Sequence, residues 1–93
     1  MDRFNIGETV ICWRNSKDSN GNYADPETSM EVKIDGPGVN NIKVDYTEMT
    51  KDETGKYHYD CQTIGYSSGK HGAYYKATDG TRITIEVETF ELE

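Results

Sequence analysis

The chain has 93 residues and no shift in composition divides it, so we predict one domain over residues 1–93. Hydrophobic residues make up only 33% of the sequence, which is enough for one thin core and leaves little room for a deep ligand cavity. The net charge is −7, with 10 lysines and arginines against 17 acids, so we expect no nucleic acid as a partner.

The first third of the chain shows short segments of alternating apolar and polar residues, as β-strands do. A first edge strand is predicted near Arg3–Ile6, ended by Gly7. Thr9–Asn15 carries apolar groups on both faces, which predicts a central strand. The polar segment Ser16–Pro26 is rich in turn formers and predicts a loop that caps one end. Met30–Ile34 alternates cleanly and predicts a half-buried strand.

The middle of the chain repeats this alternation. In Ile42–Tyr46 every second residue is apolar, and a turn is predicted at Lys51–Gly55. Tyr57, Tyr59 and Cys61 then share one face of a strand. Tyr66–Gly72 predicts a second, flexible loop.

The last third contains the clearest hairpin signal, Asp79-Gly80. The strand after it carries two apolar sets of opposite parity. These are Ile83, Ile85 and Val87 in one set, and Phe90 and Leu92 in the other. A β-bulge near Glu88–Thr89 would let both sets point inward, so we predict one there. The total is about seven strands.

The turn residues recur in an order that resembles a known family. The segments that carry the resemblance are Gly7-Glu8-Thr9-Val10, Asp25-Pro26, Gly36-Pro37-Gly38, Gly55-Lys56-Tyr57-His58-Tyr59 and Ala77-Thr78-Asp79-Gly80. They resemble the immunoglobulin-like β-sandwich modules of prokaryotic surface proteins and tailed-virus particles, over nearly the whole chain. The resemblance implies an all-β, immunoglobulin-like β-sandwich of about seven strands. Arg14 departs from the family pattern, which usually has an apolar residue there.

The resemblance also implies a class of function, although such a fold hosts many roles. A short module that starts at its own Met1 is most similar to a virion accessory protein of a phage, in head decoration, neck or fibre support. We therefore expect a non-catalytic structural or interaction module that is made in the cytoplasm and assembled into a virion. Its expected partners are other virion proteins, and an oligomer is compatible with this role. A cell-surface location is the alternative. No apolar run reaches the about 20 residues that span a bilayer, so membrane insertion is not expected.

One loop contains a candidate calcium site. Asp18, Asn20 and Asn22 place oxygen-bearing side chains two residues apart, as the start of a calcium loop does. The EF-hand pattern fails at its sixth and twelfth positions, and a hydrated turn explains the same residues. A calcium-stiffened spacer is therefore an alternative function, while the leading hypothesis includes no cofactor.

Cysteine and histidine offer a zinc ligand set by residue type alone: Cys12, His58, Cys61 and His71. The spacing opposes this site, because His58 and Cys61 project from opposite faces of one strand. Cys12 and Cys61 have the parity to face each other across the core. Buried free thiols are favoured over a disulfide, since cytosolic thiols stay reduced.

We predict no enzyme, because the chain has no nucleophile elbow, no phosphate-binding loop and little room for a pocket that would perturb its many carboxylates. Glu86 and Glu88 are expected to point outward into solvent.

Aromatic residues supply the candidate binding surface, because tyrosine and tryptophan give large contact area and a polar tip. The candidates are Trp13, Tyr23, Tyr66 and Tyr74. If Trp13 points outward, these residues predict a sugar-stacking platform, and the alternative function is a carbohydrate-binding adhesion module. We assign three other tyrosines to the core: Tyr57, Tyr59 and Tyr75.

Overall fold

The computed structural model describes residues 2–38 and 40–93, so Met1 and Val39 of the predicted domain lie outside the described part. All regular elements in that part are strands. They are β1 (Asp2–Phe4), β2 (Thr9–Asn15), β3 (Ser29–Asp35), β4 (Ile42–Glu48), β5 (Thr50–Glu53), β6 (Lys56–Gln62), β7 (Gly69–Asp79) and β8 (Arg82–Leu92). These residues include no helix that could cross a membrane.

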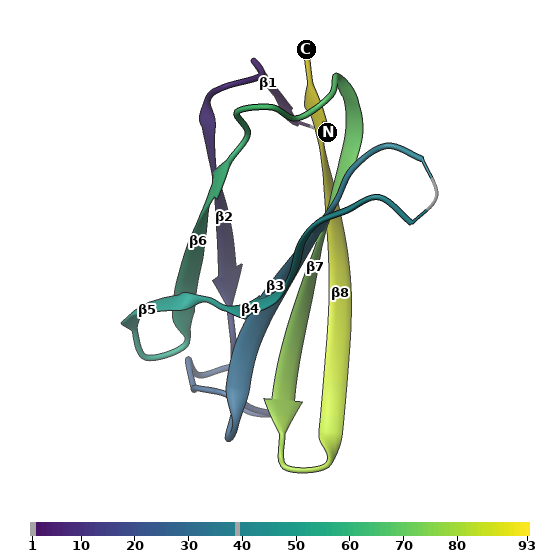
Figure 1. Cartoon of the computed structure of the whole chain (residues 1–93). Helices are drawn as coiled ribbons and strands as arrows, with labels where there is room; N and C mark the ends of the chain where they lie inside the picture. The colour runs from purple at the N-terminus through teal and green to yellow at the C-terminus, as the bar shows by residue number, and fades with distance from the viewer. Residues whose placement is uncertain (1, 39) are drawn as a thin grey trace.

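The strands form two sheets, one with the order β1-β8-β7-β3-β4 and one with the order β2-β6-β5. Figure 1 shows the long β7–β8 hairpin running the length of the molecule and reaching past the smaller sheet. All pairings are antiparallel except that of β1 with β8. The chain is therefore all-β with two sheets, as predicted.

A single apolar cluster lies between the sheets. The smaller sheet contributes Val10, Cys12, Tyr57 and Cys61, and the larger sheet contributes Met30, Val32, Ile34, Ala73, Tyr75, Phe90 and Leu92. Tyr59 packs against this cluster. The three tyrosines assigned to the core are thus confirmed at the interface of the sheets. The sequence prediction missed Met49, which is buried where the chain crosses from β4 to β5.

The predicted hairpin is present, although its two turn residues are Gly80-Thr81 rather than Asp79-Gly80. Asp79 pairs with Arg82 across a two-residue turn. Gly80 has a φ of 61°, a left-handed conformation that glycine adopts at no steric cost. The Asp79 carboxylate also accepts the Glu27 N–H at 2.6 Å, which ties the loop before β3 to this turn.

The predicted central position of Thr9–Asn15 is wrong, because β2 is an edge strand of the smaller sheet. Val10 and Cys12 are buried, while Ile11 and Trp13 lie exposed on the outer face. The apolar residues on both faces gave the misleading signal. The outer face of the smaller sheet is left open because, within residues 2–38 and 40–93, no other strand packs on it.

Three element boundaries also differ from prediction. The first strand is Asp2–Phe4 rather than Arg3–Ile6, because its length is set by parallel pairing with β8. Thr50–Glu53 is a strand, and only the two residues after it make the predicted turn. β7 begins at Gly69, inside the loop predicted over Tyr66–Gly72.

The alternation in β4 does not persist along the strand. The register against β3 shifts, so that Val44 lies opposite Ile34 while Thr47 lies opposite Val32. These bulges change which side chains face inward. Tyr46 is therefore turned to the outer face, contrary to the uniform alternation predicted for Ile42–Tyr46.

Candidate interaction surface

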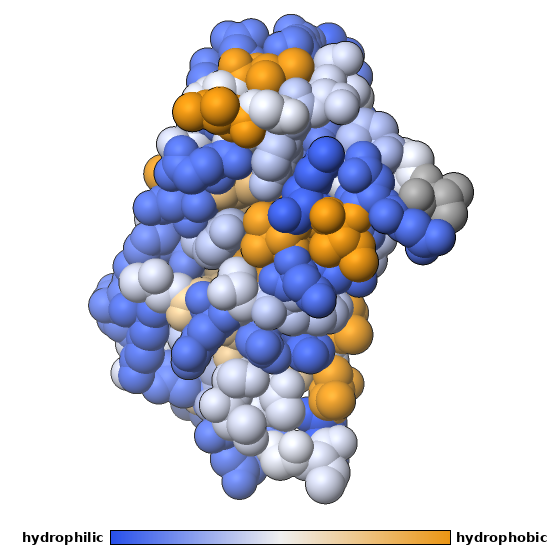
Figure 2. All heavy atoms as spheres, in the orientation of Figure 1, coloured by the Kyte–Doolittle hydropathy of each residue, from blue (hydrophilic) through white to orange (hydrophobic). Residues whose placement is uncertain are grey.

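The outer side of β8 carries a row of exposed apolar side chains, which we name the β8 stripe: Ile83, Ile85 and Val87. They are 58%, 50% and 52% exposed. Alternate residues of a strand share one face, so the three side chains lie in a line. Figure 2 shows apolar surface along the lower right of the molecule, at the edge that β8 occupies in Figure 1. Isolated apolar residues are ordinary on a surface, so it is the arrangement of these three in one row that makes the outer side of β8 a candidate contact site.

The β-bulge predicted near Glu88–Thr89 is wrong. β7 and β8 pair residue by residue over all 11 positions without a register shift. The parity of β8 is therefore constant, and only one of its two apolar sets can face the core. Phe90 and Leu92 take the buried face, which leaves the β8 stripe outside.

Next to the stripe, the same face carries tyrosine rings covered by lysine side chains. Tyr74 lies opposite Val87, and Lys33 Nζ is 4.5 Å from the Tyr74 ring centroid. Lys76 Nζ is 4.2 Å from the ring centroid of Tyr46. In such cation–π contacts the lysine side chain lies along the face of the aromatic ring. The apolar stripe thus has an amphipathic border.

The stripe lies beside an open backbone edge. β8 pairs with β7 on one side, and on the other side β1 covers only Phe90–Leu92. Within residues 2–38 and 40–93, no strand pairs with the free side of Arg82–Thr89. Unpaired N–H and C=O groups along an apolar edge are a template for a further strand. The edge strand β5, by contrast, has the charged run Lys51–Glu53, which discourages such pairing.

The inner side of this edge is polar. Arg14 of β2 forms ion pairs with Glu86 and Glu88, the latter at 3.1 Å, and its guanidinium carbon lies 5.2 Å from the Tyr75 ring centroid. The two carboxylates are solvent-exposed as expected, but they have the inner parity of Phe90 rather than the outer one. Arg14 therefore neutralises acidic charge at the β8 edge.

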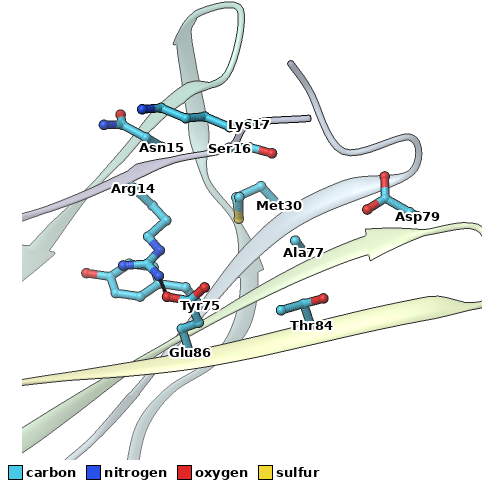
Figure 3. A pocket seen from close by; sticks show the side chains of 10 residues that line it. All are labelled: Arg14, Asn15, Ser16, Lys17, Met30, Tyr75, Ala77, Asp79, Thr84 and Glu86. Atoms are coloured by element: carbon cyan, nitrogen blue, oxygen red, sulfur yellow. Dashed lines mark ion pairs between the residues drawn. The ribbon is translucent and has the colours of Figure 1, made fainter. Parts of the chain in front are cut away.

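A hollow of about 190 Å³ lies next to this ion pair. Figure 3 shows the Arg14 guanidinium beside the Tyr75 ring and paired with Glu86, with Lys17 and Asp79 elsewhere on the wall. Small-molecule sites usually begin at about 300 Å³ and are mainly apolar. This hollow is smaller and is lined by charges of both signs, so it does not resemble such a site.

The four aromatic candidates do not form one surface. Trp13 is 61% exposed on the outer face of the smaller sheet, and its ring centroid is 5.5 Å from that of His58. Tyr74 lies on the outer face of the other sheet. Tyr23 is in the loop after β2, and Tyr66 is partly buried in the segment before β7. The predicted sugar-stacking platform is therefore not assembled, and Trp13 is the largest exposed ring among them.

The candidate calcium residues form a turn. Asp18 Oδ1 accepts the backbone N–H groups of Asn20 at 2.9 Å and Asn22 at 3.0 Å. An aspartate that bonds its own backbone in this way stabilises a turn without any ion. In the described part of the chain, no three His, Cys, Asp or Glu side chains gather in a way that could hold a metal. Calcium binding by the asparagine oxygens stays a prediction.

The two cysteines lie in the same sheet, not on opposite sides of the core as expected. Cys12 pairs with Tyr59 and Cys61 pairs with Val10 on neighbouring strands, so the two residues are diagonal neighbours. Both thiols are free and buried. Burial raises the pKa of Cys12 to about 11 and also raises the pKa of Cys61. Neither thiol is therefore set up as a nucleophile.

The two histidines have separate environments. His58 Nδ1 is 2.8 Å from the Asp52 carboxylate on the outer side of the smaller sheet. His71 is fully buried and its ring stacks between Tyr66 and Phe90, with centroid separations of 5.7 and 5.4 Å. The zinc set of cysteines and histidines is not brought together. Polar sequence surroundings concealed the core position of His71.

Asp25 is the centre of a hydrogen-bond cluster that its sequence neighbours do not indicate. Its carboxylate accepts the Gly55 N–H at 2.8 Å and the Tyr57 hydroxyl at 3.0 Å, and it pairs with Lys51 at 2.5 Å. These contacts, led by Lys51, lower the pKa of Asp25. Burial and then Asp25 raise the pKa of Tyr57 to about 12. The Asp25-Pro26 pair predicted a turn, but its partners are 26 to 32 residues away and left no local signal.

Comparison with known proteins gave no match to a family model, to a curated protein or to a solved structure.

Proposed function

We propose that this chain is a non-catalytic structural or interaction module of immunoglobulin-like type that binds protein through the open edge of β8. The observation that supports the proposal is the β8 stripe beside unpaired backbone at Arg82–Thr89. Both features favour the same ligand, an extended strand.

The mode of binding would be strand addition. Backbone hydrogen bonds along Arg82–Thr89 would provide affinity, and the β8 stripe would select apolar side chains at alternate positions of the partner. Full burial of an isoleucine or valine contributes about 1.5 to 3 kcal/mol. The stripe residues are half exposed, so each can add about 1 kcal/mol on binding. Tyr74 and Lys76 at the border would add polar contacts.

The setting of the proposal comes from the sequence resemblance. It is that of a virion accessory protein that decorates a head or supports a neck or fibre, with a cell surface as the alternative.

Site-specific photo-crosslinking tests the proposal in the cell or particle that contains the chain. A photoreactive amino acid would replace Ile85, and the matched control would replace Ile11, which is 47% exposed on the other sheet against 50% for Ile85. We expect protein adducts from position 85 that are weak or missing from position 11. If positions 83, 85 and 87 all gave no adduct, the β8 edge would not be a binding surface.

A carbohydrate-binding module is the second candidate, supported by the exposure of Trp13 beside His58. Exposed indole rings stack on sugar rings in the same way as on other flat surfaces. A glycan array distinguishes the candidates. A sugar ligand that is lost in W13A and kept in I85K would favour this function over binding through β8.

A further inference from the structure

The pattern of side chains along the free part of β8 is complementary to itself. In a second copy related to the first by a two-fold axis that passes through Ile85 perpendicular to the sheet, the two β8 strands run antiparallel to each other. Ile85 then faces Ile85 of the second copy, and Ile83 faces its Val87. On the inner side Arg82 faces Glu88, and Thr84 faces Glu86. Apolar residues meet apolar residues, and opposite charges meet, which are the favourable cross-strand pairs.

We infer that the β8 edge binds a second copy of this chain in this register and joins two five-stranded sheets into one continuous sheet. The inference rests on the proposed function, since it names the partner of the same edge. A two-fold contact of this kind uses the same surface on both copies and closes on itself. Once paired, neither copy has a free β8 edge, so this contact joins two copies and adds no third.

The position of β1 supports this register. Asp2 pairs with Phe90, so the free edge ends at Thr89. In the proposed pairing Arg82 of the second copy lies opposite Glu88, and the chain then turns away at Gly80-Thr81 before it reaches β1.

Moving the two-fold axis by one residue in either direction gives less favourable cross-strand pairs. Moving the axis to Glu86 would place Glu86 against itself, and like charges directly opposite are destabilising. It would also place Arg82 of the second copy on Phe90, whose free side β1 already occupies. Moving the axis to Thr84 would leave Val87 opposite a threonine of the turn. The register centred on Ile85 is the longest one in which every stripe residue meets an apolar partner.

Charges on the inner side are balanced for such a contact. Inward-pointing charges often protect an edge strand from pairing. Here Arg14 already pairs with Glu86 and Glu88. Arg82 has no acidic partner within 4.0 Å among the described residues, so its guanidinium is available to Glu88 of the second copy. The charged groups on the inner side of the contact are then two arginines, Arg14 and Arg82, and two glutamates, Glu86 and Glu88, in each copy.

The self-facing position of Ile85 allows a specific test by sedimentation velocity, over a concentration series that reaches about 1 mM so that weak association is seen. We expect a monomer–dimer equilibrium for the unaltered chain. I85K and I85E, each alone, should weaken it at least tenfold, because like charges then face each other at the axis. An equimolar mixture of the two variants should restore dimers. I11K, equally exposed on the other sheet, should dimerise like the unaltered chain.

Circular dichroism and thermal melts of each variant show that folding is intact, as expected for a side chain that is 50% exposed. A chain that stays monomeric at about 1 mM would overturn the inference. So would an I85K variant that dimerises normally, or a mixture no better than either variant alone.

Cross-linking at position 85 separates the two proposals. Adducts to other proteins, from a chain that is monomeric when pure, would overturn the self-pairing and keep the proposed function. The absence of every adduct would overturn both.

Discussion

Truncation of one isoleucine in the core and one on the β8 stripe tests which face of β8 the fold buries. Ile34 is 0% exposed between the sheets, and Ile85 is 50% exposed on the outer face. The substitutions I34A and I85A remove the same atoms. Any difference between them therefore reports the surroundings rather than the chemistry of the change.

The expected magnitudes follow from burial. I34A should lower the free energy of unfolding by about 2 to 5 kcal/mol, because it loses the transfer free energy and leaves a cavity. I85A leaves no cavity and loses about half of the transfer term, so it should cost about 1 kcal/mol or less. For a domain of this size each kcal/mol shifts the Tm by about 4 to 8 °C. I34A should thus lower the Tm by at least about 8 °C.

Urea unfolding followed by circular dichroism measures both values, at low protein concentration so that association does not add to stability. The slope of the unfolding free energy against urea should not change. The bulge that the sequence favoured would have turned Ile85 into the core. If I85A cost as much as I34A, the outward assignment of the β8 stripe would be wrong, and the interaction surface with it.

Three further outcomes are expected. Burial raises the pKa of Cys12 to about 11, so about 0.1% of this thiol is thiolate at pH 8. The native thiols should therefore react with Ellman's reagent about 100 times more slowly than those of the unfolded chain, and fast labelling of the native protein would contradict their burial. The pKa of Asp25 is lowered in the folded state, so its carboxylate adds stability above about pH 3.8 that is lost as the pH falls through the folded pKa. In urea melts, the difference in stability between the unaltered chain and D25N should shrink below that pH. A difference that stays constant would contradict the stabilising contacts assigned to the Asp25 carboxylate. The Tm should not change with calcium or EDTA because Asp18 already caps its own turn, and a calcium-induced rise lost in D18N would instead support the spacer function.

Local patterns in the sequence were enough for several parts of the fold. The alternation in Met30–Ile34 identified a strand and its buried face, and Asp79-Gly80 identified the hairpin. Tyr57 and Tyr75 were assigned correctly to the interior. In each case the signal depends on residues within a few positions of one another, where period and turn chemistry act directly.

The candidate site was only partly predictable. The residues expected to bind were aromatic, whereas the surface is formed mainly by the β8 stripe. The sequence also could not link Asp25 to Lys51 or place His71 in the core. Those contacts join segments far apart in the chain, and no short-range pattern encodes them.

By itself, the sequence determined that the chain alternates in short strands and has enough apolar side chains for one thin core. It did not determine which side of β8 is buried, because Ile83, Ile85 and Val87 are as apolar as Phe90 and Leu92. Only the tertiary structure decided between them. An unbroken ladder with β7 admits one parity along the whole strand, and the smaller sheet covers just one of the two faces.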